Sequence, residues 1–416
     1  MQDSGKRATP RGRAVPRRWR LPAIAVAVGV ALAGCSSDDG AGPETTSGTA
    51  AATTTTDVTP ESTAAPTTTQ PPVEDGPLIE VCPERIAIQT TMLPGPDVGP
   101  LFALLGPDPQ VDSATATVSS QLVRVDGTAE DVVLELRSGG PAVGFATALE
   151  LLAADPEILL AQTSTATALR HDSAAPSLGV VSLTDRSRDV LIVDPATYPD
   201  VDTIDSVRDA GIAVHHRTDD PFTAYLAGTG ALDPTQLVAG FDGEPAAFVQ
   251  SGGTIIQQGD ALVDPVLIPS LPQWGRPIVA IDGTESGWAA YDDVLAVRRT
   301  EVDESADCLE RLVPVIQQAI TAYASDPNET NGLMTITRAQ FTPLARLTVE
   351  LMDAGVAEGV ASGVFGDGAD STTGNFDTDR LEPFLTELSE ILEVDPVAVD
   401  ELVTNDFIDP SITSAG

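Results

Sequence analysis

Short apolar runs alternate with helix-like stretches from residue 85 to residue 298, and this alternation constrains the fold more than any other feature. Short apolar or β-branched runs predict strands, and the amphipathic stretches between them predict helices. A chain with this alternation favours an α/β fold with mostly parallel sheets. The predicted strands are 85–90, 114–125, 142–145, 158–161, 179–183, 190–193, 211–214, 237–240, 261–263, 277–281 and 293–297.

The predicted helices fall into two groups. Those between the strands are short, whereas the chain after residue 299 is helical throughout. In 304–323, for example, apolar residues recur with the period of a helix. The short group comprises 128–136, 146–153, 203–209, 221–227 and 244–250, and the second group comprises 304–323, 337–352, 378–392 and 396–403.

The first 35 residues have the parts of a bacterial export signal. Seven basic residues precede an apolar run at 21–32, which is too short to span a membrane, since a spanning helix needs about 20 apolar residues. The run leads into Leu32-Ala33-Gly34-Cys35, which resembles a lipobox. That resemblance implies cleavage after Gly34 and a lipid on Cys35, which would anchor the chain to a membrane. An uncleaved anchor is the alternative, and the pair Arg17-Arg18 leaves the Sec and twin-arginine export routes open.

Residues 35–76 predict a disordered tether between the lipid and a folded part that begins at residue 77. After Cys35 the segment consists almost entirely of Ser, Thr, Ala, Pro, Gly and acidic residues, with no basic residue. Such a composition buries too little apolar surface to offset the entropy of ordering, and its like charges keep it extended. The acids are Asp38, Asp39, Glu44, Asp57, Glu61, Glu74 and Asp75.

Charge and motif content exclude several functions. The chain has 62 acidic and 22 basic residues and a formal charge of −40, so it would repel nucleic acid. With only three His and three Cys and no CxxC motif, a zinc site is not expected, nor any other metal or cofactor. No GxSxG, HExxH, P-loop or GxGxxG pattern occurs in the folded part, which argues against an enzyme.

The order of these pieces resembles the extracytoplasmic substrate-binding proteins of ABC importers, and in particular the group that binds nitrate, sulfonates, taurine and thiamine precursors. Two departures from the family are a missing bulky motif in 95–113 and an extra loop at Gly366–Asp379. The matching segments are 190–193 with 203–213 (TIDSVRDAGIA), 223–232 with 238–241, 244–265 (EPAAFVQSGGTIIQQGDALVDP) and 401–408 (ELVTNDFI).

The resemblance implies a type II periplasmic-binding-protein fold, in which two lobes close on a ligand and the C-terminal region is helical. Residues 77–185 and 299–416 would form the first lobe, and residues 186–298 the second. The implied function is capture of a small polar ligand, such as a sulfonate, nitrate, an amino-acid-like compound or a pyrimidine. The lipid-anchored protein would then deliver it to an ABC permease at the extracytoplasmic face of the cell membrane.

Candidate ligand-binding residues follow predicted strands, because ligands of open parallel sheets sit beyond the carboxyl ends of the strands. Both signs of charge among them suggest a polar or zwitterionic ligand. Each residue also has an ordinary explanation as a helix cap, a solvated loop residue or a turn. The candidates are Thr90, Thr91, Met92 and Thr147 from the first lobe, and Arg217, Thr218 and Asp264 from the second.

Two other functions stay open. One is a thiamine-pyrimidine-synthase-like enzyme on the same fold, for which His215-His216 would be the reactive group. The other is an envelope or sensory lipoprotein without a transport role. The loop at Gly366–Asp379 has residues typical of a calcium loop, but it lacks the EF-hand spacing and fits an ordinary solvated loop better.

With Cys35 assigned to lipid, Cys82 and Cys308 remain as a pair in an oxidising compartment, which predicts a disulfide between them.

We predict that the mature chain begins at a lipid-modified Cys35. Mass spectrometry of the N-terminal peptide from the membrane fraction should give residue 35 with the mass of a diacylglycerol added. Cys35→Ser should abolish both the modification and the membrane association. An unmodified cysteine, or retention of residues 1–34, would show that the export signal has been misread.

Overall fold

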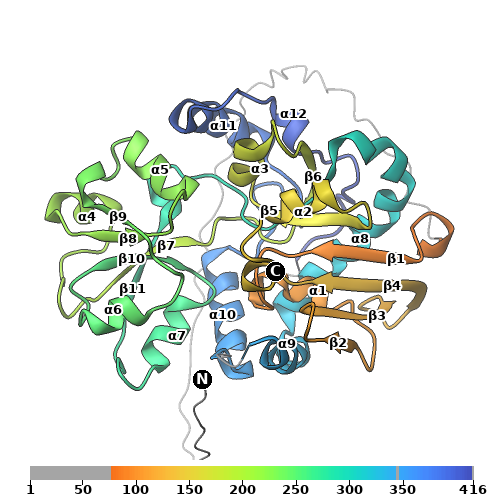
Figure 1. Ribbon diagram of the computed structural model, residues 1–416, viewed down its shortest axis with the longest axis horizontal. Coiled ribbons are helices and arrows are strands. Elements are labelled where there is room, and N and C mark those ends of the chain that lie inside the picture. Colours follow the sequence, from red (N-terminus) through yellow and green to blue (C-terminus); the bar gives the residue numbers. More distant parts are fainter. Residues whose placement is uncertain (1–75, 343–345, 415–416) are drawn as a thin grey trace, which may run out of the picture. The chain divides into compact units, whose positions relative to one another are not determined.

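Two mixed β-sheets organise the computed structural model, which describes residues 76–342 and 346–414. Strand order in the seven-stranded first sheet is β2-β3-β4-β1-β5-β12-β6, and β1 is parallel to both β4 and β5. Figure 1 shows the sheet with its flanking helices. Its strands are β1 (Arg85–Gln89), β2 (Gln110–Asp112), β3 (Thr117–Val123), β4 (Ala129–Arg137), β5 (Ile158–Thr163), β6 (Ser177–Ser182) and β12 (Val294–Arg298).

The second sheet has five strands in the order β11-β7-β10-β8-β9. β8, β9 and β10 run parallel, whereas β7 is antiparallel to both of its neighbours, β10 and β11. The chain therefore leaves the first sheet after β6, builds the second sheet, and returns through β12. The strands are β7 (Asp189–Val193), β8 (Val214–His216), β9 (Leu237–Ala239), β10 (Ile256–Asp260) and β11 (Val279–Asp282).

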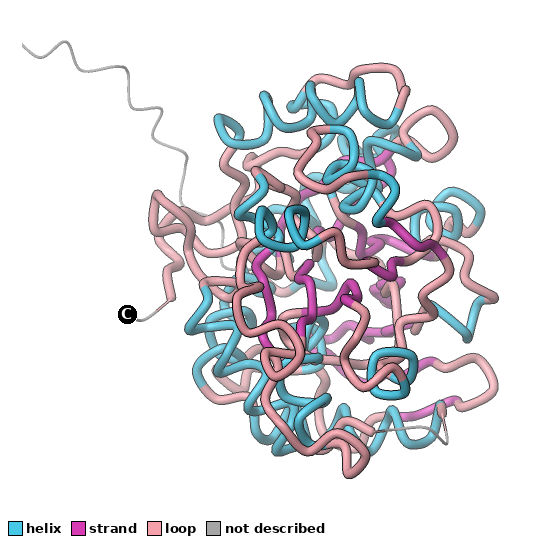
Figure 2. Tube along the Cα trace, turned by 90° about the vertical axis from the view of Figure 1, so that its left-hand side faces the viewer, coloured by secondary structure: helices cyan, strands magenta, loops and turns pink. Residues whose placement is uncertain are grey.

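Helices enclose the strands, as Figure 2 shows from a second direction. The longest, α8, buries its predicted apolar stripe against the first sheet, including Leu309, Leu312 and Ile316. The described helices are α1 (Gly99–Phe102), α2 (Ala148–Ala154), α3 (Thr165–His171), α4 (Ile204–Ala210), α5 (Pro221–Gly228), α6 (Ala246–Gln250), α7 (Asp264–Ser270), α8 (Val302–Ser325), α9 (Asn328–Phe341), α10 (Val349–Ser362), α11 (Thr378–Leu392) and α12 (Val399–Leu402).

Several predicted elements were wrong. Segment 142–145 was predicted as a strand, but Gly140–Val143 is a 3-10 helix. The helix predicted at 337–352 is interrupted, since α9 ends at Phe341 and α10 begins at Val349. Segment 128–136 was predicted as a helix, but Ala129–Arg137 is strand β4, in which every second residue is buried, as in a strand. The strand predicted at 293–297 was assigned to the second lobe, but β12 pairs with β5 and β6 of the first sheet. Segment 261–263 is a turn rather than a strand, and helix α7 begins directly after it at Asp264.

The core is continuous across the two sheets on one side of the molecule. One hydrophobic cluster includes Leu149 of α2, Leu191 of β7 and Leu388 of α11. A second cluster lies between the first sheet and α8, and a small third one lies in the second sheet. The two sheets are therefore joined by packing as well as by their chain connections.

None of the described helices is long and apolar enough to span a bilayer. The predicted signal peptide, Cys35 and most of the predicted tether lie outside the described residues.

The predicted disulfide between Cys82 and Cys308 is confirmed, with their Cα atoms 4.7 Å apart. Cys82 precedes β1 and Cys308 lies in α8, so the bond fastens α8 to the start of the first sheet. Both cysteines are buried.

We predict that breaking this bond lowers the free energy of unfolding by about 2–4 kcal/mol. The chain-entropy model gives about 5 kcal/mol for so long a loop, and measured disulfides usually contribute less than this model predicts. Urea unfolding of the protein with and without reductant measures the change, and the Cys82→Ala/Cys308→Ala variant should give the same result in both conditions. An identical midpoint in reductant, with alkylation proving both thiols free, would contradict the prediction.

Candidate ligand-binding site at the facing sheet edges

Polar residues gather where the strands of each sheet end. Thr91 follows β1, and Asp293 immediately precedes β12, whose start lies beside the end of β5. In the second sheet Asp260 ends β10, Arg217 follows β8, and Asp189 begins the antiparallel strand β7. Each group lies at the carboxyl edge of its sheet, which is where α/β folds bind ligands.

Gln162 of β5 connects the polar residues of the first edge. Its side-chain oxygen accepts hydrogen bonds from the backbone N–H and the hydroxyl of Thr91, at 2.9 and 3.1 Å. Its Nε2 donates to Asp293 at 2.8 Å and to Asp97 at 3.2 Å. The Gln162 side chain is fully buried, and with its polar atoms satisfied it has a fixed orientation.

Arg188, in the connection between β6 and β7, ties the two edges together. Its Nε and Nη2 donate to the two oxygens of Asp293, at 2.7 and 3.0 Å, in a bidentate pair. Its Nη1 pairs with Asp260 at the end of β10. One guanidinium therefore contacts a carboxylate from each sheet. We call Arg188, Asp260, Asp293, Gln162 and Asp97 the edge network.

Burial controls the electrostatics of this network. It raises the pKa of Asp97 to about 6, although the charge of Arg188 opposes the rise. The pKa values of Asp292 and Asp293 are also raised, again by burial and against the effect of Arg188. Burial alone would lower the pKa of Arg188, but Asp260 and Asp293 raise it well above its usual value. The edge thus holds more carboxyl groups than its cation can neutralise.

A second set of hydrogen bonds fixes the edge of the second sheet. Gln258 Nε2 donates to Asp189 at 3.0 Å and to Asp220 at 2.9 Å, and its oxygen accepts the backbone N–H of Arg217 at 3.2 Å. Burial raises the pKa of Asp189 well above its usual value, and the Arg217 charge offsets part of this rise.

Arg217 is the predicted residue whose position best suits a ligand. It is exposed, and its guanidinium lies 5.9 Å from the centre of the Phe241 ring. In the part of the chain that the structure describes, its side chain forms no ion pair. Thr218, beside it, is also exposed.

Asp264 has a different position from the one expected. It does not end a strand but begins α7, and it is buried, with its carboxylate accepting the backbone N–H of Asp260 at 2.8 Å. Burial raises the pKa of Asp264 to about 7, while the backbone hydrogen bond and Arg217 oppose the rise. Its carboxylate therefore holds the turn that carries Asp260.

The predicted residues of the first sheet have mixed positions. The Thr90 hydroxyl is buried and donates to the Met92 carbonyl at 2.9 Å, whereas the Met92 side chain is 49% exposed. The Thr147 hydroxyl caps α2 by accepting the Glu150 N–H, so its ordinary explanation as a cap fits. Thr91 alone among them joins the edge network.

The centre of the site was not predicted from the sequence; it consists of Gln162, Arg188, Asp260, Asp97 and Asp293. Three local signals could have found some of them: Gln162 is a polar residue inside an apolar strand, Arg188 is a base in an acidic chain, and Asp260 is a carboxylate at the end of a strand.

His216 was the candidate reactive group of the alternative enzyme function. Its ring is hydrogen-bonded within the protein, to the Thr223 hydroxyl at 3.0 Å and the Arg217 carbonyl at 2.7 Å. The described residues contain no group of three or more His, Cys, Asp or Glu arranged for a metal ion.

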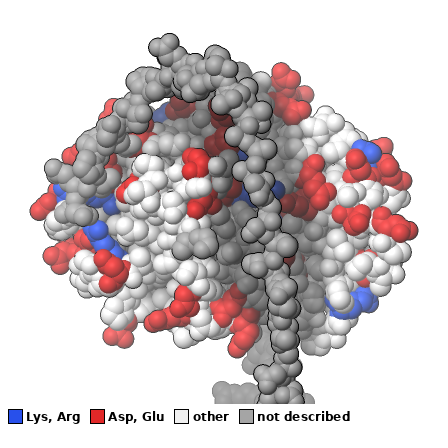
Figure 3. Space-filling model, turned by 180° about the vertical axis from the view of Figure 1, so that it is seen from behind, with Lys and Arg blue, Asp and Glu red and all other residues white. Residues whose placement is uncertain are grey.

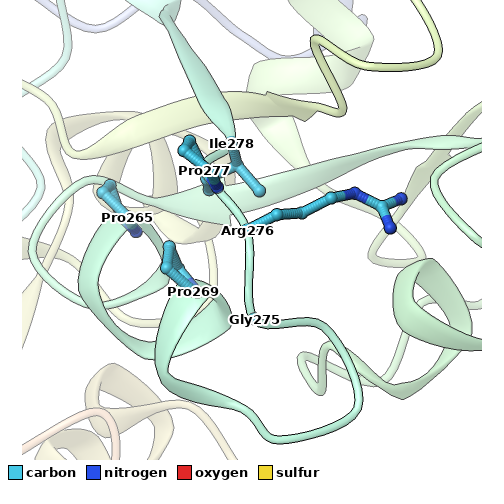
Figure 4. Close-up of a pocket in the computed structure, with 6 residues that line it drawn as sticks. All are labelled: Pro265, Pro269, Gly275, Arg276, Pro277 and Ile278. Atoms are coloured by element: carbon cyan, nitrogen blue, oxygen red, sulfur yellow. The ribbon is translucent and has the colours of Figure 1, made fainter.

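A pocket of about 350 Å³ lies elsewhere, beside α7 (Figure 4). None of its lining residues is a predicted site residue. Its one charged side chain, Arg276, is engaged by Asp194 at 2.8 Å and by the Trp274 ring. The pocket is lined by Pro265, Pro269, Gly275, Arg276, Pro277 and Ile278.

We predict that Asp264 makes the protein less stable as the pH rises from about 4 to about 7. Its pKa is higher in the folded state than the ordinary value of 3.8, so the folded form is favoured at low pH and loses that advantage as the carboxyl ionises. Asp264→Asn keeps the acceptor oxygen and should reduce the loss by up to an amount on the order of 4 kcal/mol. Unfolding at pH 4.5 and 7.5 tests this, with exposed Asp200→Asn as the control; equal pH profiles for all three proteins would contradict it.

Comparison with known proteins rests on structure alone, because no protein-family model and no curated protein sequence matches the chain. One similar structure is the ligand-binding component of an ABC-type import system from Staphylococcus aureus, solved with zinc bound. It has 12% identity and a TM-score of 0.50, and the match covers 80% of this chain and 99% of that one. Another is the periplasmic nitrate-binding protein from Synechocystis PCC 6803, with 13% identity, a TM-score of 0.50, and coverage of 78% and 87%. The chain therefore has the two-lobed fold of ABC-type substrate-binding proteins, with a helical C-terminal region.

Proposed function

We propose that the protein is the solute-binding component of an ABC importer and that it captures a small polar ligand between its two lobes. The observation that carries this proposal is the edge network, in which Arg188 joins a carboxylate from each sheet. A ligand that closes two lobes must contact both, because only then does it bind the closed state better than the open one. The lobes would be 77–185 with 294–416, and 186–293.

The charges at the site favour a zwitterion or a hydrogen-bond donor over a bare anion. Arg217 offers one exposed cation, but Asp189, Asp260 and Asp97 surround the same edges. Acidic side chains also spread over the face seen in Figure 3, and the formal charge is −40. Such a field slows the approach of an anion and favours a ligand that carries a positive or donor group.

Two exposed apolar side chains near the first edge suggest that the ligand also has an apolar part. Met92 follows β1, and Phe145, in the loop after β4, is 72% exposed. Gly140 brings the two segments together, since the Phe145 N–H donates to its carbonyl and a side chain on it would meet Met92. An amino-acid-like or pyrimidine ligand fits this mixture better than nitrate does.

The lipid anchor on Cys35 and delivery to a permease complete the proposal. An anchored binding protein at the extracytoplasmic face of the membrane would stay close to its transporter while the acidic tether gives it reach.

We predict that a thermal-shift screen of amino acids, pyrimidines, sulfonates and nitrate yields a stabilising ligand among the first two classes. Arg217→Gln should weaken its binding, measured by calorimetry, at least about tenfold, the typical effect of losing a charged hydrogen bond. Arg208→Gln in α4, where Asp205 and Asp209 neutralise the base, is the matched control. If no compound stabilises the protein, or if both variants bind equally well, the proposed site is wrong.

A further inference from the structure

Helix α10 carries two glycines that receive a side chain from the opposite lobe. Gly355 and Gly359 are four residues apart and so lie on the same face of the helix. A methyl group on Gly355 would overlap the carbonyl oxygen of Leu262, and one on Gly359 would overlap the Leu262 side chain. Leu262 therefore lies directly over both glycines, in a contact that only residues without a side chain allow.

Leu262 follows a strand of the second sheet in the sequence, but its side chain packs in the hydrophobic cluster of the first sheet. It lies in the turn between β10 and α7, yet it is 1% exposed and forms part of the first sheet's hydrophobic cluster with Met352 and Val356 of α10. Figure 1 shows α10 between α7 and the helices of the first sheet. An apolar side chain thus crosses from one lobe into the core of the other.

Helix α10 is held firmly on the first-lobe side. Asp353 accepts hydrogen bonds from Asn328 and Asn331 of α9, both at 2.7 Å. Helix α9 in turn anchors itself through Arg338, which donates to the Pro94 carbonyl at 2.8 Å. The glycine face is therefore a fixed surface on which Leu262 docks.

The same turn carries the edge network. The backbone N–H of Leu262 donates to one oxygen of Asp260 at 2.8 Å, and the other oxygen of Asp260 pairs with Arg188. Movement of Leu262 away from α10 would thus pull on the ion pair between Asp260 and Arg188. The apolar contact and the charged contact act as one unit.

The chain connections between the two lobes have the features of a hinge. They flank the second sheet in the sequence, and between them the Trp288 N–H donates to Ser187 at 3.0 Å. Trp288 also packs on Phe222 of the second lobe and on Phe384 of α11, with ring centres 5.5 and 5.1 Å apart. Closure about this aromatic group would bring Leu262 onto α10.

We propose that Leu262 and the Gly355–Gly359 face of α10 form a latch that holds the two lobes together without a ligand. The latch sets the balance between open and closed forms, and ligand capture has to begin with its release. This inference goes beyond the proposed function, and its test needs no ligand.

The test measures the separation of the lobes by pulsed electron paramagnetic resonance. Val125→Cys and Val238→Cys place spin labels at exposed positions of the first and second lobes. The full chain carries Cys35→Ser so that only these two sites are labelled, and the Cys82–Cys308 disulfide stays intact. Gly355→Ala should shift the main distance to longer values, whereas Gly332→Ala in α9, where a methyl group meets nothing within 4 Å, should leave it unchanged.

A second variant separates the latch from general damage to α10. The methyl group of Gly359→Ala meets the Leu262 side chain, so the double variant with Leu262→Ala should recover part of the shorter distance between the labels. The methyl group of Gly355→Ala meets the backbone of Leu262, so the double variant of Gly355→Ala with Leu262→Ala should not recover it. Leu262→Ala alone should increase the longer-distance population. Unchanged distances in both Gly355→Ala and Leu262→Ala, with the proteins folded by circular dichroism, would overturn the latch whether or not the protein binds a solute.

Discussion

The bidentate pair between Arg188 and Asp293, extended to Asp260, is the interaction on which the arrangement of the lobes depends. A buried charge is tolerated only when it is paired and hydrogen-bonded, and here the pairing partners come from different sheets. Removing one partner of a buried pair costs about 3–5 kcal/mol, because the other charge is left without compensation. Separating Asp260 or Asp293 from Arg188 would therefore leave this guanidinium without full compensation.

The hydrogen bonds of Gln162 fix the orientation of its side-chain amide at the same edge. The amide nitrogen is directed at the carboxyl groups of Asp97 and Asp293, and the amide oxygen at Thr91. The donors of this amide are thus used within the protein. Both oxygens of Asp293 are also fully used, by Gln162, Arg188 and Thr184, whereas Asp97 keeps further acceptor capacity. A site with spare acceptors selects molecules that bring their own N–H or O–H groups. This is the physical reason for favouring ammonium or amide ligands over oxyanions.

Sequence patterns predicted the fold better than they predicted the site. The helical period of 304–323 predicted α8, and the short apolar runs predicted most of the strands. These predictions work because an element that buries one face has apolar residues at regular intervals in the sequence. The strand β4 was misread since its charged residues at 130, 131 and 135 interrupt the alternation. The edge network has no such regular pattern: Gln162 and Asp293 are 131 residues apart, and only the assembled sheet brings them together. Thr91 was predictable because the end of a strand is a local feature.

The place of β12 in the first sheet governs the order in which the protein can assemble. This strand lies between β5 and β6, which do not pair with one another, yet it is made only after the whole second sheet. A chain that emerges from its N-terminus therefore has β5 and β6 with an empty position between them until residue 298 has emerged. Contacts of such long sequence separation form slowly. The unfinished edges of β5 and β6 need protection while the chain folds, and the numerous acidic residues of the chain, which repel other copies, supply it.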